Sequence, residues 1–138
     1  MVKMNRRSAL TLALAAASAV AASEKAIAQR STTSAGKEIA PGVKQVDLGK
    51  GASMLPAYKS VAMHDFVYQP KAKTVNPSMI SDMVCHCAQG SLRVKPGDGA
   101  EFVAKPGDVW SCNKGQPETV ENIARGVSIM RVINLLPG

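Results

Sequence analysis

Residues Asp82–Gly90 have the sequence DMVCHCAQG, and this stretch decides the fold. Successive side chains of a β-strand point to opposite faces, so Met83, Cys85 and Cys87 would share one face and His86 would lie on the other. The cysteines and the histidine therefore do not readily bind one metal ion. The glycine that ends the run indicates a tight turn into a following strand.

Short alternating segments separated by glycine and proline continue to the C-terminus. No helical stripe of any length follows residue 43, and many short strands with regular turn signals favour a β-sandwich or barrel. We therefore predict an all-β chain. Its expected strands are Val43–Leu48, Ser60–Tyr68, Met83–Ala88, Ser91–Lys95, Glu101–Ala104, Asp108–Cys112, Glu118–Ile123 and Val127–Leu135, with a loop or weak strand at Thr74–Ser81.

The N-terminus has the pattern of an export signal. Met1–Ser8 is basic and includes the pair Arg6-Arg7, and Ala9–Ala22 is apolar but too short to span a bilayer as a helix. We predict a twin-arginine-like signal peptide over residues 1–28, cleaved after Ala28, and a periplasmic or secreted protein. An ordinary secretory signal and an uncleaved membrane anchor are the alternatives.

The remaining 110 residues suffice for one domain. We expect a flexible lead-in over residues 29–42 and a barrel over residues 43–138. Four basic residues and one acidic residue leave with the signal, so the net charge falls from +7 to +4. The basic residues are scattered singly, without interleaved aromatic residues, which argues against a nucleic-acid partner.

Three cysteines are an odd number for an exported protein. Cys85 and Cys87 are poorly placed to bridge each other, because their side chains run nearly parallel on one strand face. Cys112 could form a disulfide with either of them in an oxidising compartment. At least one cysteine must be free, paired between chains or bound to something else.

Residues Phe66–Leu136 resemble the cupin family, whose two motifs surround a small double-stranded β-helix, a jelly-roll barrel. The resemblance lies in the order and spacing of turn residues, and it implies the cupin fold. The first motif of the family ends on a glycine, which matches Gly90. Between the motifs lie a proline-glycine turn and a strand, which match Lys105–Trp110. The second motif contains a glycine, a proline and a closing asparagine, which match Gly115, Pro117 and Asn122.

The metal-binding positions depart from the cupin pattern. The glutamate of the first motif is replaced by Met83, and the histidine of the second motif by Glu118. The histidine pair of the first motif corresponds to Asn76 and Ser78, or to Pro77 and Met79. A site of three histidines and one glutamate is therefore not available. The implied cofactor is one transition metal ion, with copper, zinc, iron and manganese left open, or none.

The register implied by the resemblance turns Met83, Cys85 and Cys87 into the barrel, near Cys112. Such soft donors suit Cu(I), or zinc for thiolates. Core packing and a disulfide are the plainer interpretations of the same residues.

A register slip of one residue would instead turn His86 inward together with Asp82 and Val84. With Glu118 and His64 this would form a site suited to zinc or iron. Without such a site, we expect His64 to be an exposed or hydrogen-bonded structural residue.

The leading functional hypothesis is an exported protein that binds a small ligand, a metal or both in its barrel cavity. The ligand would contact Met83, Trp110 and Cys112, and packing of Trp110 in the core is the alternative for that residue. The alternative is a cupin-type metalloenzyme, a lyase, isomerase or oxygenase, that uses Glu118 with His86 or His64 as acid and base. A third possibility is an accessory domain with a filled barrel. The resemblance also implies a homodimer, to which Val127–Leu136 would contribute.

Overall fold

The computed structural model describes residues 36–138. The predicted signal peptide, its cleavage site and residues 29–35 lie outside the described residues. Within residues 36–138, no helix is long and apolar enough to cross a membrane.

The described chain is built from β-strands and contains no helix, which confirms the all-β prediction. Most strands start and end at the glycine and proline turns visible in the sequence. The strands are β1 Lys37–Ala40, β2 Val43–Ala52, β3 Ser60–Tyr68, β4 Lys73–Asn76, β5 Asp82–Gln89, β6 Leu92–Pro96, β7 Phe102–Ala104, β8 Val109–Cys112, β9 Glu118–Asn122 and β10 Ser128–Leu136.

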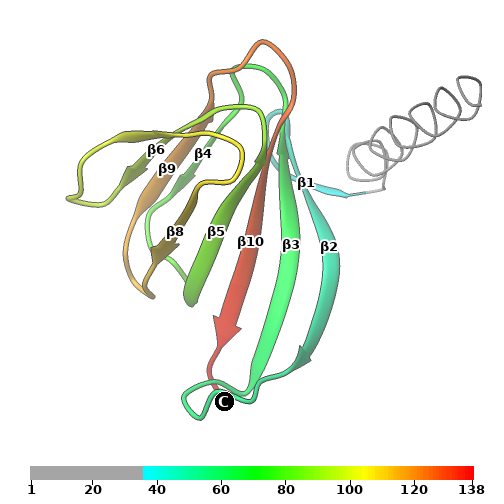
Figure 1. Ribbon diagram of the computed structural model, residues 1–138, viewed down its shortest axis with the longest axis vertical. Helices are drawn as coiled ribbons and strands as arrows, with labels where there is room; N and C mark the ends of the chain where they lie inside the picture. Colours follow the sequence, from blue (N-terminus) through cyan, green and yellow to red (C-terminus); the bar gives the residue numbers. More distant parts are fainter. Residues whose placement is uncertain (1–35) are drawn as a thin grey trace, which may run out of the picture. The chain divides into compact units, whose positions relative to one another are not determined.

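The strands form two antiparallel sheets that pack face to face (Figure 1). One sheet has six strands in the order β1-β2-β3-β10-β5-β8, and the other has four in the order β4-β9-β6-β7. Consecutive strands repeatedly change sheet, as from β5 to β6 and from β9 to β10. This alternation winds the chain into a double-stranded β-helix, and it places residues of both sheets around one interior.

The core lies between the sheets and follows the alternation of each strand. In β5, Met83, Cys85 and Cys87 are buried, whereas the residues between them are half-buried. They pack with inward residues of the opposite sheet such as Leu92 and Val120. The register implied by the family resemblance is therefore confirmed, and the sulfur-bearing face looks inward.

The strand ends differ from the sequence-based expectation in the N-terminal part. β1 lies within the segment predicted as a flexible lead-in, and it pairs with β2, as in Lys37 with Gln45. β2 also continues past the predicted break at Gly49 to Ala52. The reason is a shift of register between Asp47 and Gly49, which lets the strand bend without ending.

Gly90 and Asn122, which close the first and second cupin-like motifs, meet around Ser128 at the start of β10. Gly90 has a positive φ of 80°, and a Cβ there would collide with the backbone of Ser128, 2.8 Å from its Cα. The Ser128 hydroxyl donates to Asn122 Oδ1 at 2.7 Å, and the backbone N–H of Ser91 donates to that hydroxyl at 3.0 Å. A glycine and an asparagine are therefore needed here to join the two sheets at one end.

Candidate functional site

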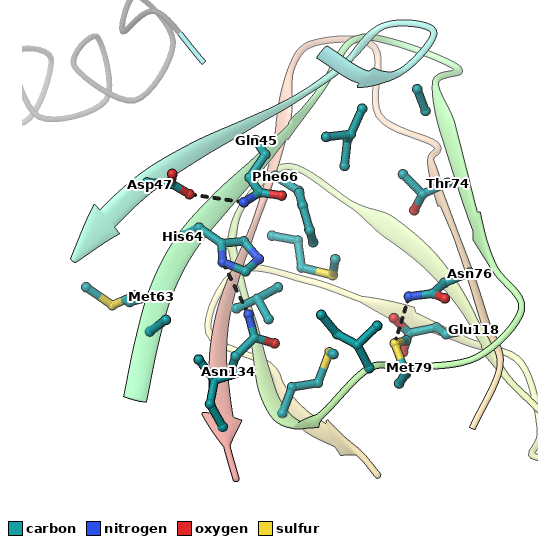
Figure 2. A pocket seen from close by; sticks show the side chains of 18 of the residues that line it. Gln45, Asp47, Met63, His64, Phe66, Thr74, Asn76, Met79, Glu118 and Asn134 are labelled. Carbon is teal, nitrogen blue, oxygen red and sulfur yellow. Dashed lines mark hydrogen bonds between the residues drawn. The ribbon is translucent and has the colours of Figure 1, made fainter. Parts of the chain in front are cut away.

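A cavity of about 700 Å³ opens between the two sheets. This volume is within the range of small-molecule sites. Most of its lining is apolar, and polar side chains reach it from both sheets (Figure 2). Apolar residues of the lining include Ala62, Phe66, Met79, Met83, Met130 and Val132, and polar ones include Gln45, His64, Asn76, Glu118 and Asn134.

His64 projects into this cavity from β3, in the six-stranded sheet. His64 is 7% exposed, and its Nδ1 lies 3.3 Å from Asn134 Nδ2 on the neighbouring strand β10. Burial lowers the pKa of His64, and the negative charges of Asp47 and Asp65 oppose this effect. His64 is therefore a buried, hydrogen-bonded residue that also faces the cavity.

Glu118 reaches the cavity from the opposite sheet, at the start of β9. It is 5% exposed, and its Oε2 accepts hydrogen bonds from Cys112 Sγ at 2.9 Å and Trp110 Nε1 at 3.2 Å. Burial raises the pKa of Glu118, and these two hydrogen bonds partly offset the rise. A carboxyl group in this setting is a candidate proton donor or acceptor for a molecule in the cavity.

Asn76 and Met79 occupy positions where the resemblance allows the first-motif histidines. Asn76 Nδ2 donates to Met79 Sδ at 3.1 Å, and both side chains line the cavity beside Glu118 (Figure 2). In one alignment the amide of Asn76 takes the place of the first histidine, and in the other the thioether of Met79 takes the place of the second. They make this wall polar without offering an ionised metal ligand.

The structure separates the sulfur donors that the sequence grouped together. Met83 lines the cavity, but Cys85, Cys87 and Cys112 do not, because they are buried in the core behind the lining. All three are free thiols, so the disulfide that Cys112 could have formed with Cys85 or Cys87 is absent. The hydrogen bond with Cys112 and burial raise the pKa of Cys85, and burial raises that of Cys87.

The predicted His/carboxylate site does not form. His86 is half-buried on the other face of β5, where it pairs in register with Arg131 and Val109, and it does not line the cavity. Asp82 points outward as well, and it accepts a hydrogen bond of 2.6 Å from the Tyr58 hydroxyl.

A register shift does occur in this region, as the alternative required. It lies between Ile129 and Met130 of β10, which pair with Gln89 and Cys87 of β5. The shift therefore comes after Cys87, and the residues of β5 before it keep the faces that the unshifted register gives them. In residues 36–138, no group of three or more His, Cys, Asp or Glu side chains is arranged to hold a metal ion. The residues therefore do not fit the metal centre that the cupin resemblance implies.

The sequence analysis turned Met83 and Glu118 toward the interior, where the structure has them, but it placed His64 there only in the slipped register and missed two polar partners. Asn134 holds the His64 ring, and Ser81 Oγ donates to Asn134 Oδ1 at 3.2 Å. The alternation of Met130, Val132 and Asn134 along β10 is a signal that could have placed Asn134 inward. Trp110, expected to contact the ligand, instead donates to Glu118 from outside the lining.

Comparison with known proteins gives a match at the level of structure. No protein-family model and no curated protein sequence matches the chain. The cupin domain of Cnp3 from Schizosaccharomyces pombe is 17% identical with a TM-score of 0.59, over 76% of this chain and 70% of that one. KdgF from Halomonas sp. is 12% identical with a TM-score of 0.58, over 74% and 86%.

An RmlC-like cupin from Methanocaldococcus jannaschii with a double-stranded β-helix fold is similar to the same degree. It is 13% identical, with a TM-score of 0.56 over 73% of this chain and 86% of that one. Likeness at such low identity concerns the fold and not the activity. Residues 36–138 therefore have the cupin fold, a jelly-roll barrel of two antiparallel sheets.

Proposed function

We propose that this chain is an exported cupin-fold protein that binds a small, mainly apolar molecule in the cavity between its sheets. The observation that carries the proposal is the cavity itself, about 700 Å³, apolar over most of its lining and supplied with a few polar groups. Sites of this size and composition are typical of small-ligand binding. The non-standard lining, with Asn76, Met79 and Glu118, supports ligand binding without the usual cupin metal centre.

Export is the part of the proposal that rests on the sequence of residues 1–28. The basic start, the apolar run and the small residues before Ala28 support it. Expression of the whole chain in a bacterium with intact export, followed by N-terminal sequencing of the periplasmic fraction, tests it. We expect a mature chain that begins at Gln29, and recovery of the uncut chain in the cytoplasm would contradict export.

Ligand binding is tested by filling the cavity. Ala62→Trp adds a large side chain to the lining, whereas Val103→Trp adds the same side chain on β7, where Val103 is exposed. A library of small uncharged molecules is screened by thermal unfolding. A molecule present at one hundred times its Kd stabilises the native state by about 2.7 kcal/mol, or about 10 °C in Tm.

The wild type and Val103→Trp should show the same set of stabilising molecules, and Ala62→Trp should lose them while remaining folded. Stabilisation that survives in Ala62→Trp would place the binding site elsewhere and contradict the proposal.

Acid–base catalysis is a second candidate function, favoured by Glu118. This carboxyl group has a raised pKa and faces the cavity from the sheet opposite His64. Two such groups could move a proton within a bound molecule, as an isomerase or lyase requires. Once a ligand that is turned over is known, Glu118→Gln should abolish turnover and keep binding. Glu121→Gln, a half-exposed residue of the same strand, is the control.

A further inference from the structure

The orientation of the Asn134 amide is fixed by a buried hydroxyl. Ser81 is 1% exposed, and its Oγ lies 3.2 Å from Asn134 Oδ1. Within residues 36–138, the Ser81 hydroxyl has no other hydrogen-bond acceptor. Rotating the amide by 180° would leave this buried hydroxyl proton without an acceptor, which costs about 1–3 kcal/mol. The amide oxygen therefore faces Ser81, and the amide N–H group faces His64.

This orientation determines which nitrogen of His64 carries the proton. Asn134 Nδ2 is a donor, so the ring nitrogen 3.3 Å away, Nδ1, must be the acceptor. A neutral imidazole has one protonated nitrogen, and the lowered pKa of His64 favours the neutral ring. The proton is therefore on Nε2.

The Nε2–H group is open to the cavity. It has no hydrogen-bond partner in the described part of the chain. Every fully buried side-chain nitrogen or oxygen there does have a partner, so Nε2 is not fully buried. Because His64 lines the cavity, the unpartnered nitrogen faces that space (Figure 2).

The opposite wall presents an oxygen in the same way. Glu118 Oε2 receives the two hydrogen bonds from Cys112 and Trp110, while Oε1 has no partner among residues 36–138 and is not fully buried. The lining carries the carboxyl groups of Glu118 and Asp47 and the ammonium group of Lys50, and most of it is apolar, which disfavours a guest with a net charge. The N–H group of His64 is thus a fixed donor in a mainly apolar space that favours an uncharged guest.

We propose that the Ser81–Asn134–His64 chain of hydrogen bonds makes the cavity select neutral carbonyl compounds, namely ketones, esters or amides, whose oxygen accepts from His64 Nε2–H. This inference rests on the proposed ligand-binding function and specifies its ligand class. The apolar remainder of the molecule would lie against Met83, Met130 and Val132, which line the same space. Ser81 and Asn134 are positioning residues in this account, and His64 contacts the ligand.

The test uses a matched pair of probes, cyclohexanone and methylenecyclohexane, which differ in the acceptor oxygen. The hydrocarbon is the more hydrophobic of the two probes, so the hydrogen bond is measured as the change that a substitution makes in the ratio of the two Kd values. One hydrogen bond contributes about 1 kcal/mol, so His64→Phe should weaken the binding of cyclohexanone about five- to tenfold relative to that of methylenecyclohexane. His64→Gln keeps an N–H donor at a similar reach and should cause a smaller relative loss, which controls for a general loss of packing.

The tautomer is measured independently by ¹⁵N NMR of the histidine rings, in free protein. We expect His64 to be protonated at Nε2 and not at Nδ1. A ratio of the two Kd values that His64→Phe leaves unchanged, or a proton on Nδ1, would overturn the proposed selectivity while leaving cavity binding intact. If neither probe binds and the library screen with Ala62→Trp also finds no cavity ligand, the proposed function fails together with this inference.

Discussion

Asn122 gives a prediction about how the two sheets are held together. Its side chain is 1% exposed and makes four hydrogen bonds. The amide donates to the carbonyls of Tyr68 and Gly126, at 3.0 and 2.9 Å. Its oxygen accepts from the backbone of Ala124 at 2.8 Å and from Ser128 at 2.7 Å. These bonds connect β9 of the small sheet to β3 and β10 of the large one.

Asn122→Ala removes all four hydrogen bonds at once. Each contributes about 1 kcal/mol net, and two of the partners are only partly buried and can turn to water. Ser128 also keeps a second acceptor, the carbonyl of Ser91 at 3.3 Å. The expected loss of unfolding free energy is therefore about 3 kcal/mol, a large fraction of the stability of a typical domain.

Urea unfolding followed by the fluorescence of Trp110, the single tryptophan, measures this loss. With an m-value of about 1–3 kcal/mol/M, the midpoint should fall by roughly 1–3 M. The control is Asn113→Ala, an exposed asparagine whose amide donates to the carbonyl of Lys114, and it should change stability by less than about 0.5 kcal/mol. A loss below about 1 kcal/mol for Asn122→Ala would refute the reasoning.

Three further predictions concern backbone, acid and thiol groups. Gly90→Ala should lower the free energy of unfolding by more than about 3 kcal/mol, because the added Cβ would collide with the backbone of Ser128. Gly107 has a φ of 97° and open space around it, so Gly107→Ala should lower the free energy of unfolding by only about 1–2 kcal/mol through backbone strain. Similar urea midpoints for the two variants would contradict this. Because burial raises the pKa of Glu118 above its ordinary 4.5, the native state binds the proton more tightly than the unfolded state. Stability should therefore fall as pH rises from below 4.5 through the folded-state pKa, and Glu118→Gln should flatten this slope; unchanged pH profiles of urea unfolding would disprove the assignment. The three buried thiols should react with iodoacetamide at pH 8 only after unfolding, and rapid labelling of the native protein would show that they are accessible.

The strands were predictable from the sequence because their signals are local. The alternation of Met83, Cys85 and Cys87 needs only the two-residue period of a strand, and the turns at Gly90 and Gly107 need only a positive φ. β1 was missed because Lys37–Ala40 is mostly exposed, so it has no alternating pattern to detect.

The site was less predictable because its contacts are long-range. The hydrogen bond between Ser81 and Asn134 joins residues 53 positions apart, and that between Asn134 and His64 joins residues 70 apart. No local pattern marks such pairs. Glu118 could be singled out because the family resemblance gave its position a role, whereas Asn134 occupies no position of either motif.

Methionine methyl groups provide the most direct test of the central claim that the cavity binds a small uncharged molecule. Four methionines line the cavity, namely Met63, Met79, Met83 and Met130, and Met54 is 99% exposed and serves as an internal control. In protein labelled with ¹³C at the methionine methyls, titration with cyclohexanone should shift the four cavity signals along one saturable curve and leave Met54 unchanged. Cavity signals that do not move, or that move no more than the signal of Met54, would contradict the account.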